Sequence, residues 1–157
     1  MPVQVIGVHR FTIRSSKRFD EVLQAIDASI GHPDTNVVMN EIAVANNDDQ
    51  FQNVIDPAGS SGVVEFFRID FTPFTGFRRS VRIIAGDPMV MCWMAGRIPE
   101  AAAYGTMAIQ IDERADGVRL SYDRISAHVE EYEDQVVFEL ARNLERRIES
   151  LLTAASQ

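Results

Sequence analysis

The stretch from Ser80 to Arg124 constrains the fold of this chain most, because its residues specify a strand, a helix and a hairpin in succession. The β-branched run 81–84 predicts a strand that ends at Gly86. Asp87 can then cap a helix whose first position is Pro88, where a missing amide hydrogen costs nothing. Asp and Asn both cap helices well, so the substitution Asp87→Asn is expected to leave stability nearly unchanged.

The helix that follows is apolar on every side. It runs from Met89 to Ala95 and is expected to end near Gly96. A helix without a polar face must be covered all round, by other parts of the chain or by a second molecule. Two alternating segments around an Asp-Gly turn, 106–114 and 118–123, then predict an antiparallel hairpin.

Three motifs of this stretch, IIAGDPMVMCWM, PEAAAY and IDERADGVRLSYDR, follow one another in order. Together they resemble the signature of a bacterial family, domain of unknown function 302. The likeness extends from about Val63 to Ala155, and Asp87 stands where the family more often has Asn. The resemblance implies a small α+β domain, often dimeric, with no established activity.

The remaining segments extend the pattern to an α+β two-layer sandwich with helices mainly on one face of an antiparallel sheet. Helical spacing predicts helices at 19–30 and at 137–152, and a third at 33–45, although Val37 and Val38 would also suit a strand. A short helix is expected at Asp48–Ile55. The predicted sheet has about five strands: Val3–Ile13, Val63–Phe71, Val81–Ala85, Thr106–Arg114 and Val118–Asp123. Five charged residues of the last helix are expected to face water: Arg142, Glu145, Arg146, Arg147 and Glu149.

Strict alternation in the second strand places Phe66 and Phe67 on opposite faces, as it does Glu65 and Arg68. If helices cover only one face of the sheet, an apolar face is left over. This predicts a symmetric homodimer, which the family resemblance also implies. The alternative is that the segment 33–55 folds over that face as a lid and leaves a monomer.

Length and charge set further bounds. A chain of 157 residues is expected to form a single domain, 1–157. The net charge of −8 argues against a nucleic-acid partner, and no window is apolar enough to span a membrane, so neither is expected. The first residues lack a basic leader and an apolar segment, and we expect a cytoplasmic protein.

Signals for metal, cofactor or nucleophile chemistry are weak. His9, His32 and His128 come from separate segments without metal-ligand spacing, so no metal is expected. No cofactor signature is present, and none is expected. Cys92 lies deep in an apolar helix and is interpreted as a structural thiol of the core.

Two hypotheses for function follow. The first is a non-catalytic, homodimeric module that binds a partner or a small apolar or amphipathic ligand, because no nucleophile–base pair can be assembled from neighbouring motifs. Its candidate ligand-binding residues are charged groups among apolar neighbours, residues of the Met- and Trp-rich helix, and two tyrosines. They are Glu65, Arg68, Arg82, Asp87, Met91, Trp93, Tyr104 and Tyr122. The second is an enzyme acting in an apolar pocket rimmed by Tyr104, Glu113, Tyr122 and Asp123, with its catalytic residues unknown.

Overall fold

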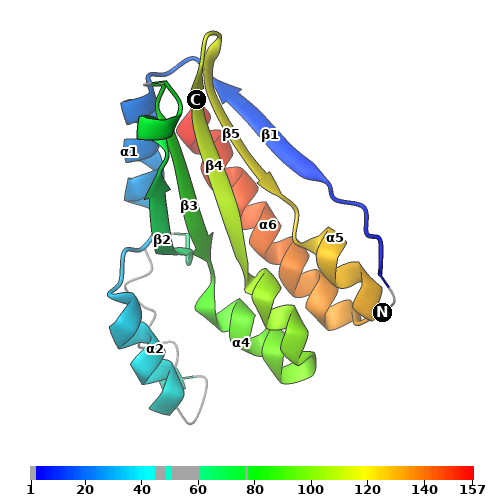
Figure 1. Cartoon of the computed structure of the whole chain (residues 1–157). Helices are drawn as coiled ribbons and strands as arrows, with labels where there is room; N and C mark the ends of the chain where they lie inside the picture. Colours follow the sequence, from blue (N-terminus) through cyan, green and yellow to red (C-terminus); the bar gives the residue numbers. More distant parts are fainter. Residues whose placement is uncertain (1–2, 45–48, 51–60, 77) are drawn as a thin grey trace.

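A five-stranded antiparallel sheet, in the order β1-β5-β4-β3-β2, forms the centre of the computed structural model. The structure describes residues 3–44, 49–50, 61–76 and 78–157 (Figure 1). The strands are β1 (Arg10–Ser15), β2 (Val64–Asp70), β3 (Ser80–Gly86), β4 (Thr106–Arg114) and β5 (Gly117–Asp123). The α+β sandwich with a mainly antiparallel sheet is therefore confirmed.

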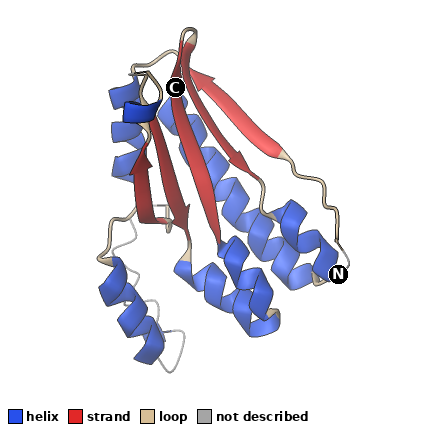
Figure 2. Ribbon diagram, in the orientation of Figure 1, coloured by secondary structure: helices blue, strands red, loops and turns tan. Residues whose placement is uncertain are grey.

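Helices α1 and α6 lie on one face of this sheet, and Figure 2 shows the long α6 crossing it diagonally. Helix α4 and the 3-10 segment η2 sit together at one end of the sheet (Figure 1). The helices are α1 (Phe19–Ser29), α2 (Thr35–Val44), α4 (Pro88–Arg97), α5 (Ser126–Val129) and α6 (Gln135–Ser156). The 3-10 segments are η1 (Thr72–Phe74), η2 (Pro99–Gly105) and η3 (Glu130–Tyr132). Among the described residues, no helix is both long and apolar enough for a membrane span.

The hydrophobic core lies between the sheet and helices α1 and α6. Alternate residues of the central strands point into it, among them Ile83, Ile109 and Leu120, all fully buried. Helix α6 contributes a stripe at helical spacing that includes Leu144 and Ile148. Each such side chain contributes about 1.5–3 kcal/mol by leaving water, so this face fixes the position of α6.

The opposite face of the sheet, which we call the open face, carries mainly polar side chains. Across its central strands lie Arg82, Gln110, Asp112, Ser121 and Asp123. The expectation that a wholly apolar face is left over is therefore wrong. Apart from Ala108 and Gly117, the alternating residues on that face of β4 and β5 are polar, and among the described residues larger apolar groups gather toward β2, where Phe67 is 61% exposed.

A bulge in β2 changes which of its residues share a face. Glu65 and Phe67 pair with consecutive residues of β3, which leaves Phe66 as an extra residue. Glu65 and Arg68 therefore lie on the same, helix-covered face, and the prediction that they lie on opposite faces is wrong. The Arg68 Nε donates to Glu65 Oε1 at 3.0 Å.

Other boundaries differ locally from the sequence prediction. The first strand begins at Arg10 instead of Val3, and Val3 and Val5 are almost fully exposed. The helical interpretation of 33–45 is confirmed by α2. The short helix expected at Asp48–Ile55 falls largely outside the described residues.

One residue of α6 expected to face water is buried instead. The Glu145 side chain is 1% exposed and accepts hydrogen bonds from the Ser126 backbone N–H and from Arg142 Nη1, both at 2.7 Å. It therefore ties the start of α5 to the middle of α6. Helical spacing alone misses this because α5 packs over the polar side of α6 at that point.

Candidate functional site

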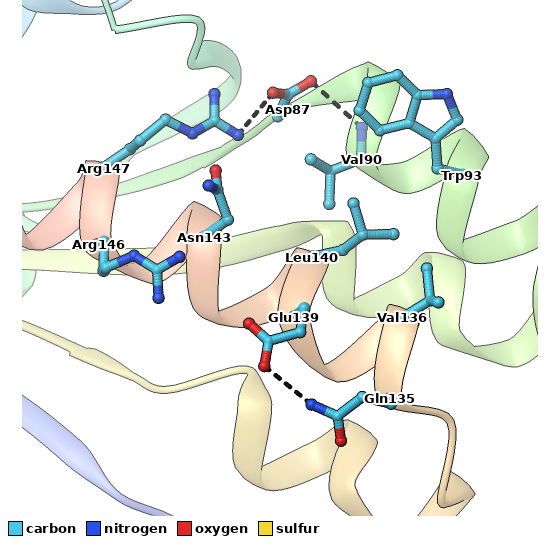
Figure 3. Close-up of a pocket in the computed structure, with 10 residues that line it drawn as sticks. All are labelled: Asp87, Val90, Trp93, Gln135, Val136, Glu139, Leu140, Asn143, Arg146 and Arg147. Carbon is cyan, nitrogen blue, oxygen red and sulfur yellow. Dashed lines mark hydrogen bonds and ion pairs between the residues drawn. The ribbon is translucent and has the colours of Figure 1, made fainter.

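A groove of about 670 Å³ runs between α4 and α6 and brings together residues far apart in the sequence (Figure 3). Its lining comes from the start of α4 and the first half of α6. The lining residues are Asp87, Val90, Trp93, Gln135, Val136, Glu139, Leu140, Asn143, Arg146 and Arg147. This volume falls within the usual range for small-molecule sites.

Asp87 begins α4 and forms one end of the groove. It is almost fully buried, and its Oδ1 accepts from the backbone N–H groups of Met89 at 2.8 Å and Val90 at 3.3 Å. Those groups would otherwise lack partners in the first turn of a helix. The cap predicted from the Gly86-Asp87-Pro88 sequence is therefore confirmed.

Arg147 of α6 binds the second oxygen of the same carboxylate. Its Nη2 donates to Asp87 Oδ2 at 2.7 Å, and its Nη1 donates to the Ser61 carbonyl at 3.3 Å. Its Nε is buried and has no hydrogen-bond partner among the described residues. The guanidinium is thus fixed at the junction of α4, α6 and the loop before β2.

The walls of the groove are apolar. Val90 and Trp93 of α4 and Val136 and Leu140 of α6 line it, and Val90 lies next to Leu140 in Figure 3. Trp93 is 41% exposed and Val136 is 47% exposed. Exposed apolar side chains that line a concave surface are typical of a binding site, because monomeric proteins bury such groups unless another molecule covers them.

Unpaired polar groups stand on the α6 rim. Within the described part of the chain, neither the Arg146 guanidinium nor the Asn143 amide has a hydrogen-bond or ion-pair partner, and the Asn143 side chain points toward the Asp87–Arg147 pair in Figure 3. At the start of α6, Gln135 Nε2 donates to Glu139 Oε1 at 2.9 Å. The groove therefore combines apolar walls with free donors beside Arg147, an arrangement suited to an anionic oxygen.

Of the eight candidate ligand-binding residues, Asp87 and Trp93 line this groove. Met91 lies elsewhere on α4. Its backbone passes so close to Gly105 that a β-carbon on Gly105 would clash with it. Tyr104 stacks on His128, with ring centroids 5.1 Å apart. The Tyr122 hydroxyl is buried and donates to Glu149 Oε1 at 2.9 Å, and burial together with this carboxylate raises its pKa.

The other three candidates occupy two further places. Glu65 and Arg68 form a cluster with Asp27 of α1 on the helix-covered face. Arg82 lies on the open face, where its Nε donates to Gln110 Oε1 at 3.0 Å. The eight residues therefore do not form one site.

The residues expected to rim an enzyme pocket do not all lie together, although Tyr122 and Asp123 both line a hollow on the open face. Glu113 accepts from the Arg79 backbone N–H at 3.2 Å at the far end of β4. Asp123 lies on the open face, where the hydrogen bond from Arg10 lowers its pKa. Neither these two residues nor Tyr104 and Tyr122 line the α4–α6 groove, so the predicted rim does not belong to it.

Sequence reasoning missed the α6 half of the groove. Val136, Leu140 and Asn143 fall in an ordinary amphipathic helix, and Arg146 and Arg147 were expected to face water. No local signal identifies them, because the groove depends on α4 packing beside α6. The one indication was the excess apolar surface of α4, which no single sheet could cover.

Comparison with known proteins identifies the fold. Neither protein-family models nor curated proteins match the sequence. Among solved structures, the chain is similar to the "crystal structure of uncharacterized conserved protein DUF302 from Bacillus stearothermophilus", with a TM-score of 0.63 and 10% sequence identity. The match covers 94% of this chain and 98% of that one. At this identity the likeness shows a shared fold.

Proposed function

We propose that this chain is a member of the domain of unknown function 302 family and a non-catalytic binding protein, whose α4–α6 groove holds a small amphipathic molecule with an anionic end. Membership is supported by the three sequence motifs together with the near-complete structural match. The observation that carries the binding proposal is the apolar groove with free donors at one end.

The orientation of the ligand follows from the chemistry of the groove. An apolar body placed over Trp93 and Leu140 would remove exposed apolar surface from water, at about 25 cal/mol per Å². A carboxylate or similar anion at the other end would accept from Arg146 and Asn143, and charge-assisted hydrogen bonds of this kind are among the stronger ones. The half-buried Arg147 guanidinium adds positive potential, which its pairing with Asp87 reduces.

The chemistry of the lining supports binding rather than turnover. The ten lining residues include no Ser, Thr, Cys, Lys or His. Both Asp87 oxygens are engaged, one by the helix cap and one by Arg147. A general base needs a free lone pair directed at a substrate proton. Oδ1 uses both of its lone pairs in the helix cap, and Oδ2 uses one for Arg147 and keeps its other beside the guanidinium.

The proposal includes self-association into a homodimer. Its support is the exposed apolar surface toward the edge strand β2, where Phe67 is 61% exposed. An exposed edge with apolar side chains is a frequent place for two copies to pair.

Trp93 allows a direct test, since it is the single tryptophan of the chain and lines the groove. Decanoate is titrated into the full-length protein below its micelle concentration, and tryptophan emission is recorded. We expect a saturable change at one decanoate per chain, with weaker binding of decanol and of the Arg146→Gln variant.

A matched pair of variants locates the site. Val136 in the groove and Val8 outside it are each 47% exposed, so Val136→Glu and Val8→Glu perturb folding similarly. Val136→Glu should abolish the fluorescence change and Val8→Glu should preserve it. Absence of saturable binding to the wild type, equal binding by Val136→Glu, or chemical conversion of the ligand would overturn the proposal.

A further inference from the structure

A second cluster of chemically active side chains lies at the end of α1 and the start of β2, away from the groove. It consists of Asp27, His32 and Glu65, whose ligand atoms all lie within 4.8 Å of one another. The three come from a helix, a connector and an edge strand, so no sequence spacing predicts the cluster.

Backbone structure brings these three residues together. The connector pairs with β2 through Gly31, whose N–H donates to the Val63 carbonyl at 2.8 Å and whose carbonyl accepts from the Glu65 N–H at 2.9 Å. This places His32 beside Glu65. The β2 bulge at Phe66 keeps both Glu65 and Arg68 on the face toward α1.

The cluster carries more negative than positive charge. Arg68 Nη2 lies 2.5 Å from Asp27 Oδ1 and 2.5 Å from Glu65 Oε2, so one guanidinium serves two carboxylates. One negative charge is therefore left over when His32 is neutral. Each carboxylate oxygen has a second lone pair that Arg68 does not use.

A hydrogen bond determines which nitrogen of the neutral His32 ring carries the hydrogen. Its Nε2 lies 3.0 Å from the Asp27 backbone carbonyl, an oxygen that can only accept, so Nε2 carries a hydrogen. In the neutral ring, Nδ1 is then an acceptor 3.6 Å from Glu65 Oε2, which is also an acceptor. Two acceptors this close to each other can share a metal ion.

We propose that Asp27, His32 and Glu65 bind a divalent transition-metal ion of the zinc class through His32 Nδ1 and one oxygen of each carboxylate. Imidazole favours such ions over calcium or magnesium, and three protein ligands leave one position for solvent. A backbone carbonyl bonded to the other ring nitrogen is the usual outer support of a metal-binding histidine. Arg68 gives the two carboxylates a comparable outer support through its hydrogen bonds to them.

The site can close on an ion with small movements. Ligands of a tetrahedral zinc, at bond lengths of about 2.0–2.1 Å, lie about 3.3 Å apart. The Asp27 and His32 side chains are 37% and 46% exposed, so both can rotate toward Glu65. The cluster shares no residue with the α4–α6 groove.

The test is calorimetric titration of zinc chloride into the full-length protein after treatment with a chelator. We expect one zinc per chain, with affinity reduced at least about tenfold in His32→Ala and in Glu65→Gln. His9→Ala is the control, because His9 is exposed and lies outside the cluster, and its affinity should equal that of the wild type. Circular dichroism verifies that each variant is folded.

Cobalt(II) provides a second readout, since its visible absorption intensifies when it enters a four-coordinate protein site. The absorption should form in the wild type and in His9→Ala and be lost in His32→Ala. Zinc binding that is absent, or that is unchanged in both His32→Ala and Glu65→Gln, would overturn the proposal.

Discussion

The Asp87 carboxylate joins two helices, because one oxygen caps α4 while the other lies 2.7 Å from Nη2 of Arg147 on α6. The sequence indicated the cap but not the ion pair. We therefore expect Asp87→Asn, which keeps the cap, to lose about 1 kcal/mol of unfolding free energy by leaving Arg147 without its anion. Asp87→Ala should lose about 2–3 kcal/mol because the cap is lost as well.

Urea denaturation of the two single variants, of Arg147→Gln and of Asp87→Asn/Arg147→Gln measures the coupling between the charges. We expect the double variant to lose less than the sum of the two single losses. Full stability of Asp87→Asn would show that only the cap matters.

Glu145 provides a second test of buried polar structure. Glu145→Ala leaves the Ser126 N–H and the Arg142 guanidinium without their acceptor, and we expect it to cost about 2–3 kcal/mol. Glu139→Ala, on the exposed side of the same helix, should change stability by less than about 0.5 kcal/mol. Thermal denaturation at neutral pH compares the two, and equal losses would contradict the buried role of Glu145.

Glycines at the junction of the sheet with α4 and η2 allow close backbone approach. A β-carbon on Gly86 would lie 2.8 Å from Thr106 Cα, and one on Gly105 would lie 2.7 Å from Met91 Cα. Gly86→Ala and Gly105→Ala should each cost at least about 1–3 kcal/mol.

The control is Gly96→Ala, since nothing lies within 4 Å of a β-carbon on Gly96. This helical glycine should gain up to about 1 kcal/mol when it becomes alanine. Chemical denaturation gives all three values, and a stable Gly105→Ala would refute the close packing of η2 on α4.

Cys92 is half-buried, whereas the sequence placed this thiol in the core. Burial, and secondly the charge of Asp87, raise the pKa of the Cys92 thiol. We expect slow alkylation by iodoacetamide at pH 7, with a rate that still rises above the ordinary thiol pKa of about 8.5. Asp87→Asn should shift this pH profile toward lower pH. Rapid stoichiometric labelling of the folded wild type at pH 7 would contradict a raised pKa of the Cys92 thiol.

The homodimer is tested by sedimentation velocity from low to high micromolar concentration. We expect the wild type to sediment as a species of twice the 17.6 kDa chain mass and Phe67→Glu to sediment as a monomer. Val8→Glu, at an exposed apolar position on another segment, should behave as the wild type. A wild type that remains near 17.6 kDa throughout would remove the dimer.

Features fixed by local chemistry were predictable from the sequence. The Asp87 cap, the helix that follows it and the Asp-Gly hairpin match the prediction within a residue or two, since neighbouring residues determine each of them. Strand order depends on contacts between distant segments, and only the structure supplies it.

The candidate site was predictable only in part. Asp87 and Trp93 were found because the α4 sequence is unusual, whereas Arg146 and Arg147 belong to an ordinary amphipathic helix. Glu65 and Arg68 were assigned to opposite faces because alternation assumes a regular strand. Glu145 was assigned to solvent because no spacing rule shows what packs on the polar side of a helix.

The extra residue in β2 has a consequence for how this sheet edge can change in evolution. Deleting Phe66 would remove the bulge and leave Glu65 and Arg68 two residues apart, still on the same face of a regular strand. The guanidinium could then still serve both Asp27 and Glu65, although the spacing of the charged residues along the chain would have changed. Two relatives with different spacing here could thus share the same cluster, and an alignment that places the gap elsewhere in β2 would conceal the likeness.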